Sequence, residues 1–389
     1  MRYMRKVLVF GAAVALLICA SHIGSTWWEF SKIKHAEPVT MDPWVRKHWN
    51  HVKILTDTLN YMQSTKTILF WTKFFGESNF VPSYSNLGCP KSPKCIITFD
   101  RKYLNRSHAV VFHLRDIKLN DMPTVRTPRQ VWILLHHEAP PHTPSDVLER
   151  VDGLFNWTAT YRMDSEINLS PIVRKKMTDT RQTKHLIQNK KKMIAWLVSN
   201  CKTPSNREGY VLELQKTVPV DIFGSCGGYT CLPKMSDECY DSLDQKYRFY
   251  LSFENSICKD YVTEKFFRIL STNIIPVVLG GANYSQIAPP NSYIDALSFK
   301  TPRDLGRYLL QVAKDDEKYQ SYFKWKETHE LVYEHYACQI CAKLNQPKIS
   351  HSTYLNISHW WFQDANCRMW TDSSKKVWEN LNRKTLIQV

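Results

Sequence analysis

The stretch that decides the fold is residues 247–281, which read YRFYLSFENSICKDYVTEKFFRILSTNIIPVVLGG. An aromatic run at 247–253 and an apolar run at 274–279 are typical of buried strands. Between them lie a polar turn at 254–256 and a helix that begins near Tyr261. This order of strand, loop, helix and strand predicts an α/β fold with a parallel sheet. Charged residues gather where the first strand ends, which is where parallel sheets bind ligands.

The start of this helix is suited to an anion. Asp260 or Thr263 can cap it, and the free N–H groups at a helix N-terminus favour a phosphate. Lys265, one turn further on, adds a positive charge. Taken alone, these residues also fit an ordinary βαβ crossover whose charged side chains face solvent.

The longer pattern resembles the donor-binding signature of the α1,3/4-fucosyltransferase family, which is glycosyltransferase family 10. The matching segments are FENS at 253–256, KDYVTEK at 259–265 and IPVVLG at 275–280, and the resemblance extends over about 67–341. It implies an inverting enzyme, most like the animal Golgi α1,3-fucosyltransferases, that transfers L-fucose from GDP-L-fucose to N-acetylglucosamine of a glycoprotein or glycolipid glycan. It also implies a GT-B fold, in which two Rossmann-like lobes face a cleft.

The rest of the chain fits two such lobes. A length of 389 residues allows two domains of ordinary size. Short apolar runs without alternation are typical of strands buried on both faces. Such runs lie at 68–71, 95–99, 109–113, 131–135, 193–198 and 220–223, and apolar residues recur at helical spacing over 301–314.

These patterns divide the chain into six parts. The basic segment 174–192, where the two lobes join, is predicted to be a helical linker. The parts are a cytosolic tail (1–6), a transmembrane signal anchor (7–26), a stem (27–66), an N-terminal acceptor-side lobe with the linker (67–190), a C-terminal GDP-fucose-binding lobe (191–345) and a C-terminal tail (346–389).

The anchor prediction rests on an uncharged apolar run that begins at Val7 and continues to Trp27 and Trp28, with Arg5 and Lys6 before it. Counted to the tryptophans, this is about the 20 residues that a helix needs to span a bilayer. The chain is then a single-pass type II protein with its catalytic region in the lumen, and the resemblance implies the Golgi membrane. A cleaved signal peptide is the alternative.

The formal net charge of +16 favours anionic partners such as a nucleotide-sugar or an anionic membrane. Runs of basic residues are more often solvated faces than nucleic-acid sites, and the lumen holds no nucleic acid, so we expect no such partner.

Cysteine usage agrees with an oxidising compartment, because ten cysteines remain once Cys19 is assigned to the anchor. The close pairs Cys89/Cys95 and Cys338/Cys341 could bridge locally, and the family resemblance favours both pairings. A zinc site on the last pair is the alternative, but a second pair at metal spacing is missing. Sequons at Asn105, Asn156, Asn168, Asn283 and Asn356 are glycosylation candidates in a lumenal protein.

Glu138 is the candidate general base. It lies in the segment HHEAPPH at 136–142, after the apolar run at 131–135, and a carboxylate at the carboxyl end of a buried strand is well placed for catalysis. A glutamate that only hydrogen-bonds its loop is one alternative. A metal site that also uses His137 and His142 is another, but two prolines separate them and the helical spacing is absent. The family carries Glu-Ser-Pro here with the glutamate as base, so the resemblance implies that role for Glu138, although alanine replaces the serine.

The resemblance also implies a set of donor-binding residues. Arg207 would hold the diphosphate with a planar charged fork, Glu264 would accept hydrogen bonds from the ribose hydroxyls, and Lys265 would neutralise the diphosphate. The full set is Tyr161, Ser199, Arg207, Tyr250, Asn255, Tyr261, Glu264 and Lys265.

No Asp-x-Asp motif occurs in the chain, so we predict that no metal or other cofactor is required. Stimulation by a divalent cation stays open. A catalytically inactive lumenal glycan-binding protein on the same fold is the alternative function, and the retained charges of Glu138, Arg207 and Lys265 argue against it. A sulfotransferase is a further alternative, but it would need a phosphate-binding loop that the sequence lacks.

Overall fold

The computed structural model describes residues 53–54, 65–82, 86–89, 94–176, 190–233, 236–371 and 378–380. The predicted cytosolic tail and anchor, as well as most of the stem, lie outside these ranges. Within them, no helix combines the length and the apolar character that a membrane span requires.

The first lobe is built on a six-stranded parallel sheet with strand order β3-β2-β4-β6-β7-β8. Its central strands are buried on both faces, as their apolar runs predicted. The strands are β2 (Thr67–Phe70), β3 (Ile96–Thr98), β4 (Ala109–His113), β6 (Val131–Leu135), β7 (Trp157–Thr160) and β8 (Ile167–Asn168). Smaller elements complete this lobe: β1 (Lys53–Ile54), β5 (Val125–Arg126), α3 (Ser145–Arg150) and the 3₁₀ helices η2 (Arg101–Arg106), η3 (Leu114–Asp116), η4 (Leu119–Asp121) and η5 (Pro140–His142).

The second lobe is built on a five-stranded parallel sheet with strand order β11-β10-β12-β13-β14. Its strands are β10 (Lys192–Leu197), β11 (Val220–Phe223), β12 (Tyr247–Phe253), β13 (Ile275–Leu279) and β14 (Ile294–Asp295). Its helices are α4 (Arg207–Gln215), α5 (Asp237–Lys246), α6 (Glu264–Leu270), α7 (Tyr284–Ile287), η6 (Ala296–Ser298), α8 (Pro302–Lys314), α9 (Asp316–Ser321) and α10 (Trp325–Thr328).

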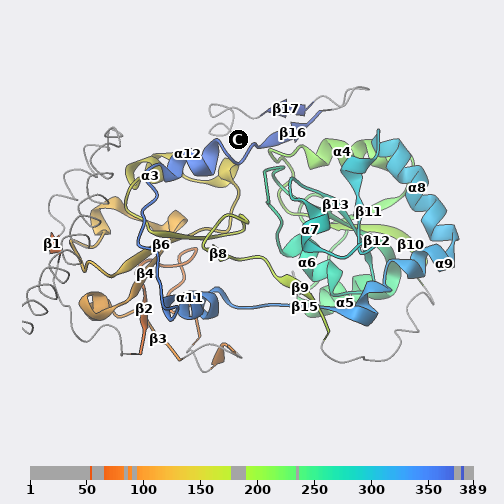
Figure 1. Cartoon of the computed structure of the whole chain (residues 1–389). Coiled ribbons are helices and arrows are strands. Elements are labelled where there is room, and N and C mark those ends of the chain that lie inside the picture. Colours follow the sequence, from red (N-terminus) through yellow and green to blue (C-terminus); the bar gives the residue numbers. More distant parts are fainter. Residues whose placement is uncertain are drawn as a thin grey trace, which may run out of the picture.

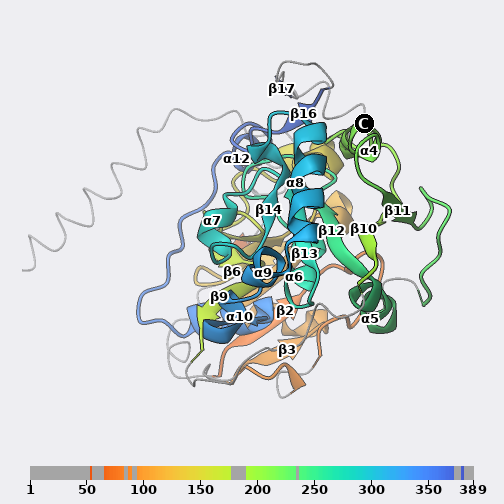
Figure 2. The same ribbon diagram turned by 90° about the vertical axis from the view of Figure 1, so that its right-hand side faces the viewer.

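The stretch 247–281 folds as predicted, into β12, α6 and β13. Of the two predicted caps, Thr263 takes the position, because its Oγ1 accepts from the Lys265 N–H. Asp260 lies in the preceding loop at φ +62°, and its carboxylate accepts from the Met163 N–H of the first lobe. Helix α8 packs its apolar side on the second sheet, where Figure 2 shows it crossing the outer face.

Two antiparallel strands lie between the lobes, β9 (Ile172–Lys175) and β15 (His329–Val332). Figure 1 shows the lobes side by side, with this pair below the place where they meet. The described ends of the predicted linker 174–192 belong to strands β9 and β10, and its remainder lies outside the described residues.

The chain then returns to the first lobe through α11 (Tyr336–Leu344) and α12 (Ile357–Phe362). The segment predicted as a C-terminal tail therefore contributes to a core, because Trp361 of α12 is 2% exposed among first-lobe residues. Strand β16 (Arg368–Trp370) then reaches the second lobe, where the Trp370 N–H donates to Ser205 O (3.1 Å), and it pairs with β17 (Trp378–Asn380).

The disulfides correct the predicted pairing. Cys89 bonds to Cys338 and Cys95 to Cys341, whereas the resemblance favoured local bridges. Cys338 and Cys341 lie one turn apart on α11, and each ties that helix to the segment before β3. Because both are in disulfides, the zinc alternative is wrong. The remaining bridges are Cys201–Cys226, Cys231–Cys239 and Cys258–Cys367.

Candidate functional site

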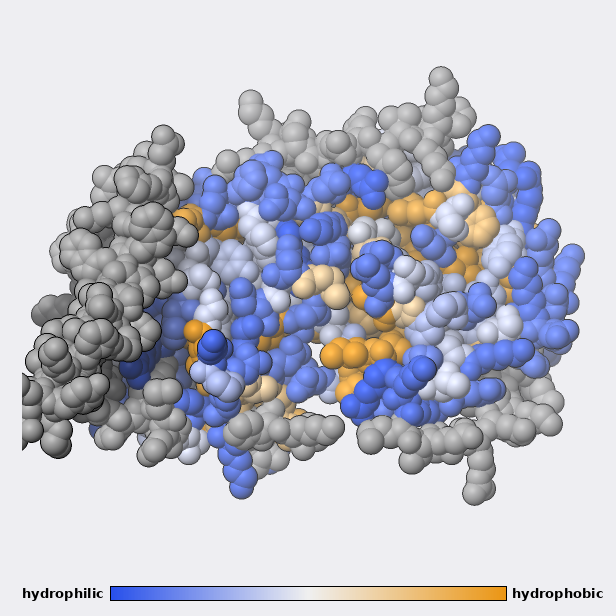
Figure 3. All heavy atoms as spheres, in the orientation of Figure 1, coloured by the Kyte–Doolittle hydropathy of each residue, from blue (hydrophilic) through white to orange (hydrophobic). Residues whose placement is uncertain are grey.

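The carboxyl ends of the two sheets meet at a pair of tyrosines. The rings of Tyr161, after β7, and Tyr261, before α6, lie 4.7 Å apart and share one buried cluster. Figure 3 shows the surface indented where the two lobes adjoin. The segments that follow β7 and β12 therefore contact each other where the lobes meet.

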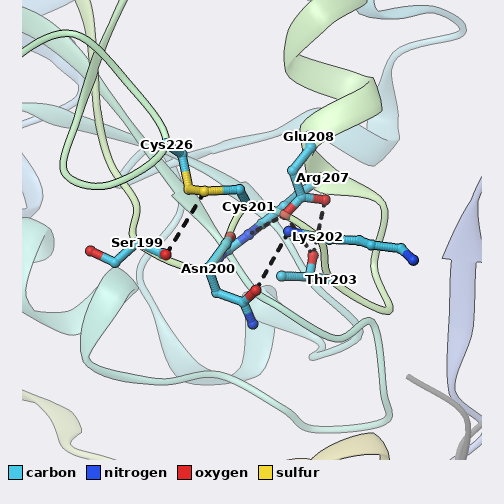
Figure 4. Close-up of a disulfide and its surroundings, with 8 residues drawn as sticks. All are labelled: Ser199, Asn200, Cys201, Lys202, Thr203, Arg207, Glu208 and Cys226. Atoms are coloured by element: carbon cyan, nitrogen blue, oxygen red, sulfur yellow. Dashed lines mark hydrogen bonds and ion pairs between the residues drawn. A yellow bond between two sulfur atoms is a disulfide. The ribbon is translucent and has the colours of Figure 1, made fainter.

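Arg207, the first residue of α4, is held by main-chain carbonyls of the second lobe. Its Nη1 donates to Phe253 O (2.7 Å) and its Nη2 donates to Asn200 O (3.2 Å). The side chain is buried, and its Nε lies 3.4 Å from Glu208. Figure 4 shows Arg207 beside Asn200, with the Cys201–Cys226 bridge closing the same loop. The guanidinium is therefore fixed in orientation by folding alone.

Lys265 is held by a network at the start of α6. Its Nζ donates to Thr263 Oγ1 (2.8 Å) and lies 3.2 Å from a carboxylate oxygen of Glu254 and 3.2 Å from one of Glu264. Burial alone would lower the pKa of Lys265, but the two carboxylates raise it above its ordinary value. The ammonium therefore keeps its charge, with 26% of its side chain exposed.

Glu264 and Glu254 differ in exposure although both contact Lys265. The Glu264 side chain is 56% exposed, and although burial would raise its pKa, Lys265 and local hydrogen bonds hold the pKa below its usual range. Glu254 is completely buried. Of these two carboxylates, Glu264 is the one exposed to solvent, and its role as a partner of ribose hydroxyls stays a prediction.

The other predicted donor residues are placed unequally. Ser199 is exposed on the loop after β10, and the buried Oδ1 of Asn255 has no protein partner among the described residues. Tyr250 does not lie at the surface: it is 2% exposed in the core between β12 and α5, with its ring 6.2 Å from that of Tyr240. It packs in a different cluster from Tyr161 and Tyr261, and its role as a donor contact stays a prediction.

The two tyrosines at the meeting of the lobes are buried, and burial raises the pKa of both. The Tyr161 hydroxyl has no hydrogen-bond partner in the described part of the chain. A neutral hydroxyl of this kind can donate to a ligand oxygen without carrying charge.

Glu138 follows β6 and is half-buried. Among the described residues, its carboxylate has no hydrogen-bond or ion-pair partner. His142, in the same loop, feels the charges of Glu138 as well as those of Arg207 and Lys265 from the second lobe. The base candidate and the two donor cations therefore all lie close enough to His142 to influence its pKa.

Neutral histidines surround Glu138. Burial lowers the pKa of His113, His136, His137 and His142, and for His137 the value is about 4. Each ring has a nitrogen without a hydrogen-bond partner within the described ranges. No group of three or more His, Cys, Asp or Glu side chains within the described ranges is arranged to hold a metal ion.

Sequence reasoning missed Glu254, although this residue belongs to the quoted FENS segment. Its position directly after the apolar run 247–253 could have identified it. An ionisable side chain that close to a buried strand is expected to be buried too, and a buried carboxylate needs a partner. Spacing alone could not separate it from Glu264, because both are glutamates in the same motif.

The five sequons also differ in their surroundings. Asn105, Asn283 and Asn356 are exposed, which suits glycosylation. Asn156 does not suit it: the side chain is 4% exposed, and its Nδ2 donates to His351 O (3.0 Å). Asn168 is half-buried, and its Nδ2 donates to Arg162 O (3.0 Å).

Two family models match the chain: the N-terminal fucosyltransferase model over residues 63–170 and the model of glycosyltransferase family 10 (fucosyltransferase), C-terminal, over residues 187–360. Alpha-(1,3)-fucosyltransferase C of Drosophila melanogaster is 37% identical over 82% of this chain and 84% of its own length. Human 4-galactosyl-N-acetylglucosaminide 3-alpha-L-fucosyltransferase 9 is 32% identical over 86% of this chain and 90% of its own. A crystal structure of an alpha1,3-fucosyltransferase with GDP is 14% identical, with a TM-score of 0.43 over 73% of this chain and 86% of that one.

Proposed function

The chain belongs to glycosyltransferase family 10, the fucosyltransferases, and from that premise we propose that it transfers L-fucose from GDP-L-fucose in α1,3 linkage to N-acetylglucosamine of a glycoprotein or glycolipid glycan. The observation that carries the proposal is the charge arrangement at the edge where the lobes meet. Arg207 and Lys265 are fixed on the second lobe, and Glu138, which has no partner in the part of the chain that the structure describes, lies on the first.

Each half of this arrangement suits one substrate. Two fixed cations and the N-terminus of α6 suit a diphosphate, and the exposed Glu264 carboxylate suits a ribose diol. Tyr161, Asn255, Tyr261 and Ser199 would complete the donor contacts. Neutral rings and an unpaired carboxylate suit an uncharged sugar that brings hydroxyl groups.

The mechanism is a single displacement. The Glu138 carboxylate takes the proton of an acceptor hydroxyl, and that oxygen forms a bond to the anomeric carbon of fucose as the bond to the GDP oxygen breaks on the opposite face. The electron pair of the broken bond leaves with GDP, so negative charge grows on the diphosphate. Arg207 and Lys265 already occupy fixed positions, so they stabilise that charge without reorganisation.

The finer features of the fold and location are part of the proposal. We assign the two parallel sheets to the GT-B class, with the acceptor bound by the first lobe and GDP-fucose by the second. The residues 7–26 would anchor the chain in the Golgi membrane as a single-pass type II protein. The apolar run with flanking basic and aromatic residues supports this assignment.

The test is transfer of labelled fucose from GDP-fucose by the full-length chain in detergent micelles. The acceptors are a panel of N-acetylglucosamine glycans with free core or antennal positions, each with and without chelator. We expect transfer to one class, with turnover unchanged by the chelator. GDP binding without transfer to any acceptor would favour the inactive glycan-binding alternative, and loss of transfer with the chelator would overturn the metal-free part.

A further inference from the structure

Glu254 is a buried carboxylate that the proposed mechanism does not use. It follows β12 directly, and none of its surface is exposed. The Thr263 N–H donates to Glu254 Oε1 (2.8 Å), the Thr263 hydroxyl lies 3.0 Å from both oxygens, and Lys265 Nζ lies 3.2 Å from Oε2. Fully buried carboxylates occur almost only where they are paired, so this network accounts for the presence of the residue.

Thr263 and Lys265 engage both carboxylate oxygens of Glu254, which has no exposed surface, so the residue has no free acceptor to offer the donor directly. It acts instead through Lys265, whose ammonium is partly exposed and also donates to the hydroxyl of Thr263, the cap of α6.

The same turn also fixes the second cation of the site. The Phe253 carbonyl accepts from Arg207 Nη1, while the adjacent Glu254 carboxylate holds Lys265. The charge of Arg207 acts to lower the pKa of Lys265, whereas that of Glu254 acts to raise it. Two like charges gathered for one diphosphate repel each other, and Glu254 supplies the counter-charge that holds them together before the donor arrives.

We propose that Glu254 is a positioning residue of the donor site: through its ion pair it holds Lys265 in the geometry that binds the diphosphate of a nucleoside diphosphate sugar. This inference rests on the proposed function and deepens it. Glu254 contributes to donor affinity through Lys265 alone.

The test begins with GDP binding by calorimetry to the full-length chain in detergent micelles. Glu254→Gln keeps the shape and an acceptor for the Thr263 N–H but removes the charge. We expect its GDP dissociation constant to rise about tenfold, and the KM for GDP-fucose to rise with it.

A matched control separates positioning from stability. Asp244 of α5 pairs with the buried Lys190 (2.8 Å) in the same lobe. Because Lys190 precedes β10, this pair lies at the amino ends of the strands, opposite to the donor site. Asp244→Asn removes the same kind of charge from the same kind of pair. We expect both variants to lower the Tm, while only Glu254→Gln weakens GDP binding.

A double-mutant cycle keeps the test decisive if Glu254→Gln is too unstable to assay. Lys265→Met and Glu254→Gln/Lys265→Met are compared, since the double variant leaves no unpaired buried charge. If Glu254 acts through Lys265, the two variants bind GDP equally. A further loss in the double variant would overturn the proposal, as would wild-type affinity in Glu254→Gln. If the wild-type chain itself does not bind GDP, the proposed function fails and not the positioning role alone.

The pH dependence of GDP binding gives a readout that a purely structural role would not move. Burial and Arg207 lower the pKa of Lys265, and Glu254 and Glu264 oppose them. His142 and Tyr240 are the other titratable groups that feel its charge. In Glu254→Gln, Lys265 should lose its proton at a lower pH, so GDP affinity should decline with rising pH earlier than in the wild type. An unchanged profile would overturn the proposal.

Discussion

The segments after β6 and β12 each follow a buried strand of one lobe, but their polar side chains differ in whether they have protein partners. After β12, every charged group of the candidate donor site already has a protein partner. After β6, Glu138 has none within the described residues, and the rings of His136, His137 and His142 each leave a nitrogen unpaired there. Folding has completed the donor side, whereas the acceptor side still lacks the groups that a substrate would bring.

The two segments also differ in charge. The second lobe presents cations whose state is secured by carboxylates, which suits an anionic leaving group. The first lobe presents histidines that burial keeps neutral, which suits an uncharged sugar. In the proposed mechanism, the second lobe stabilises the charge of the leaving group and the first lobe removes the proton.

The largest expected effect comes from removing the base. Glu138→Gln keeps the size of the side chain but cannot accept the proton, so turnover should decrease about a thousandfold. Initial rates of fucose transfer at saturating donor and acceptor measure this. A decrease of less than about tenfold would remove Glu138 from the role.

Removing a fixed cation should have the next largest effect. Arg207→Ala removes the guanidinium and frees the carbonyls of Phe253 and Asn200, so transfer should decrease about a hundredfold and GDP should bind more weakly. Arg248→Ala is the control, because Arg248 lies in β12 near Asp316 and away from the strand's carboxyl end. Equal losses in both variants would mean that the effect is a general destabilisation.

The Cys201–Cys226 bridge closes the loop that carries Asn200, so it should matter less than Arg207 itself. Replacing both cysteines with serine should weaken GDP binding several-fold and lower the free energy of unfolding by about 3 kcal/mol. The control replaces Cys231 and Cys239 with serine, because the bridge between these two cysteines closes a shorter loop. Unfolding experiments measure the stability of the two double variants, and calorimetry measures their GDP affinity. Similar GDP affinities in both variants would contradict a role of the Cys201–Cys226 loop in holding Arg207.

The smallest expected effect is a difference in pH response. Histidines whose folded pKa is lowered bind fewer protons than in the unfolded chain, so stability should decrease as the pH falls below 6.5 toward about 4. GDP affinity should stay constant from about pH 6 to 9, because the pKa of Glu264 is lowered and that of Lys265 is raised. Tm and GDP titrations across this range measure both. If GDP affinity decreased together with Tm as the pH falls from 6.5 toward 6, the proposed division of roles between the lobes would be contradicted.

Local sequence patterns predicted much of the fold, because the strands are continuous apolar runs and helix α6 begins at a capping residue, Thr263. The stretch 247–281 is of this kind, as are the positions of Glu138 after β6, Arg207 at the start of α4 and Lys265 in the first turn of α6. The disulfide pairs could not be predicted, since they join segments 249 and 246 residues apart. The burial of Tyr250 and the return of α12 to the first lobe likewise depend on tertiary packing.

The central claim is that the two lobes divide binding and proton removal between them. The most direct measurement is the GDP dissociation constant of the wild type, Glu138→Gln and Arg207→Ala, determined by calorimetry in one buffer. The account predicts that Glu138→Gln binds GDP as the wild type does, while Arg207→Ala binds it at least tenfold more weakly. A loss of GDP affinity in Glu138→Gln as large as that in Arg207→Ala would contradict it.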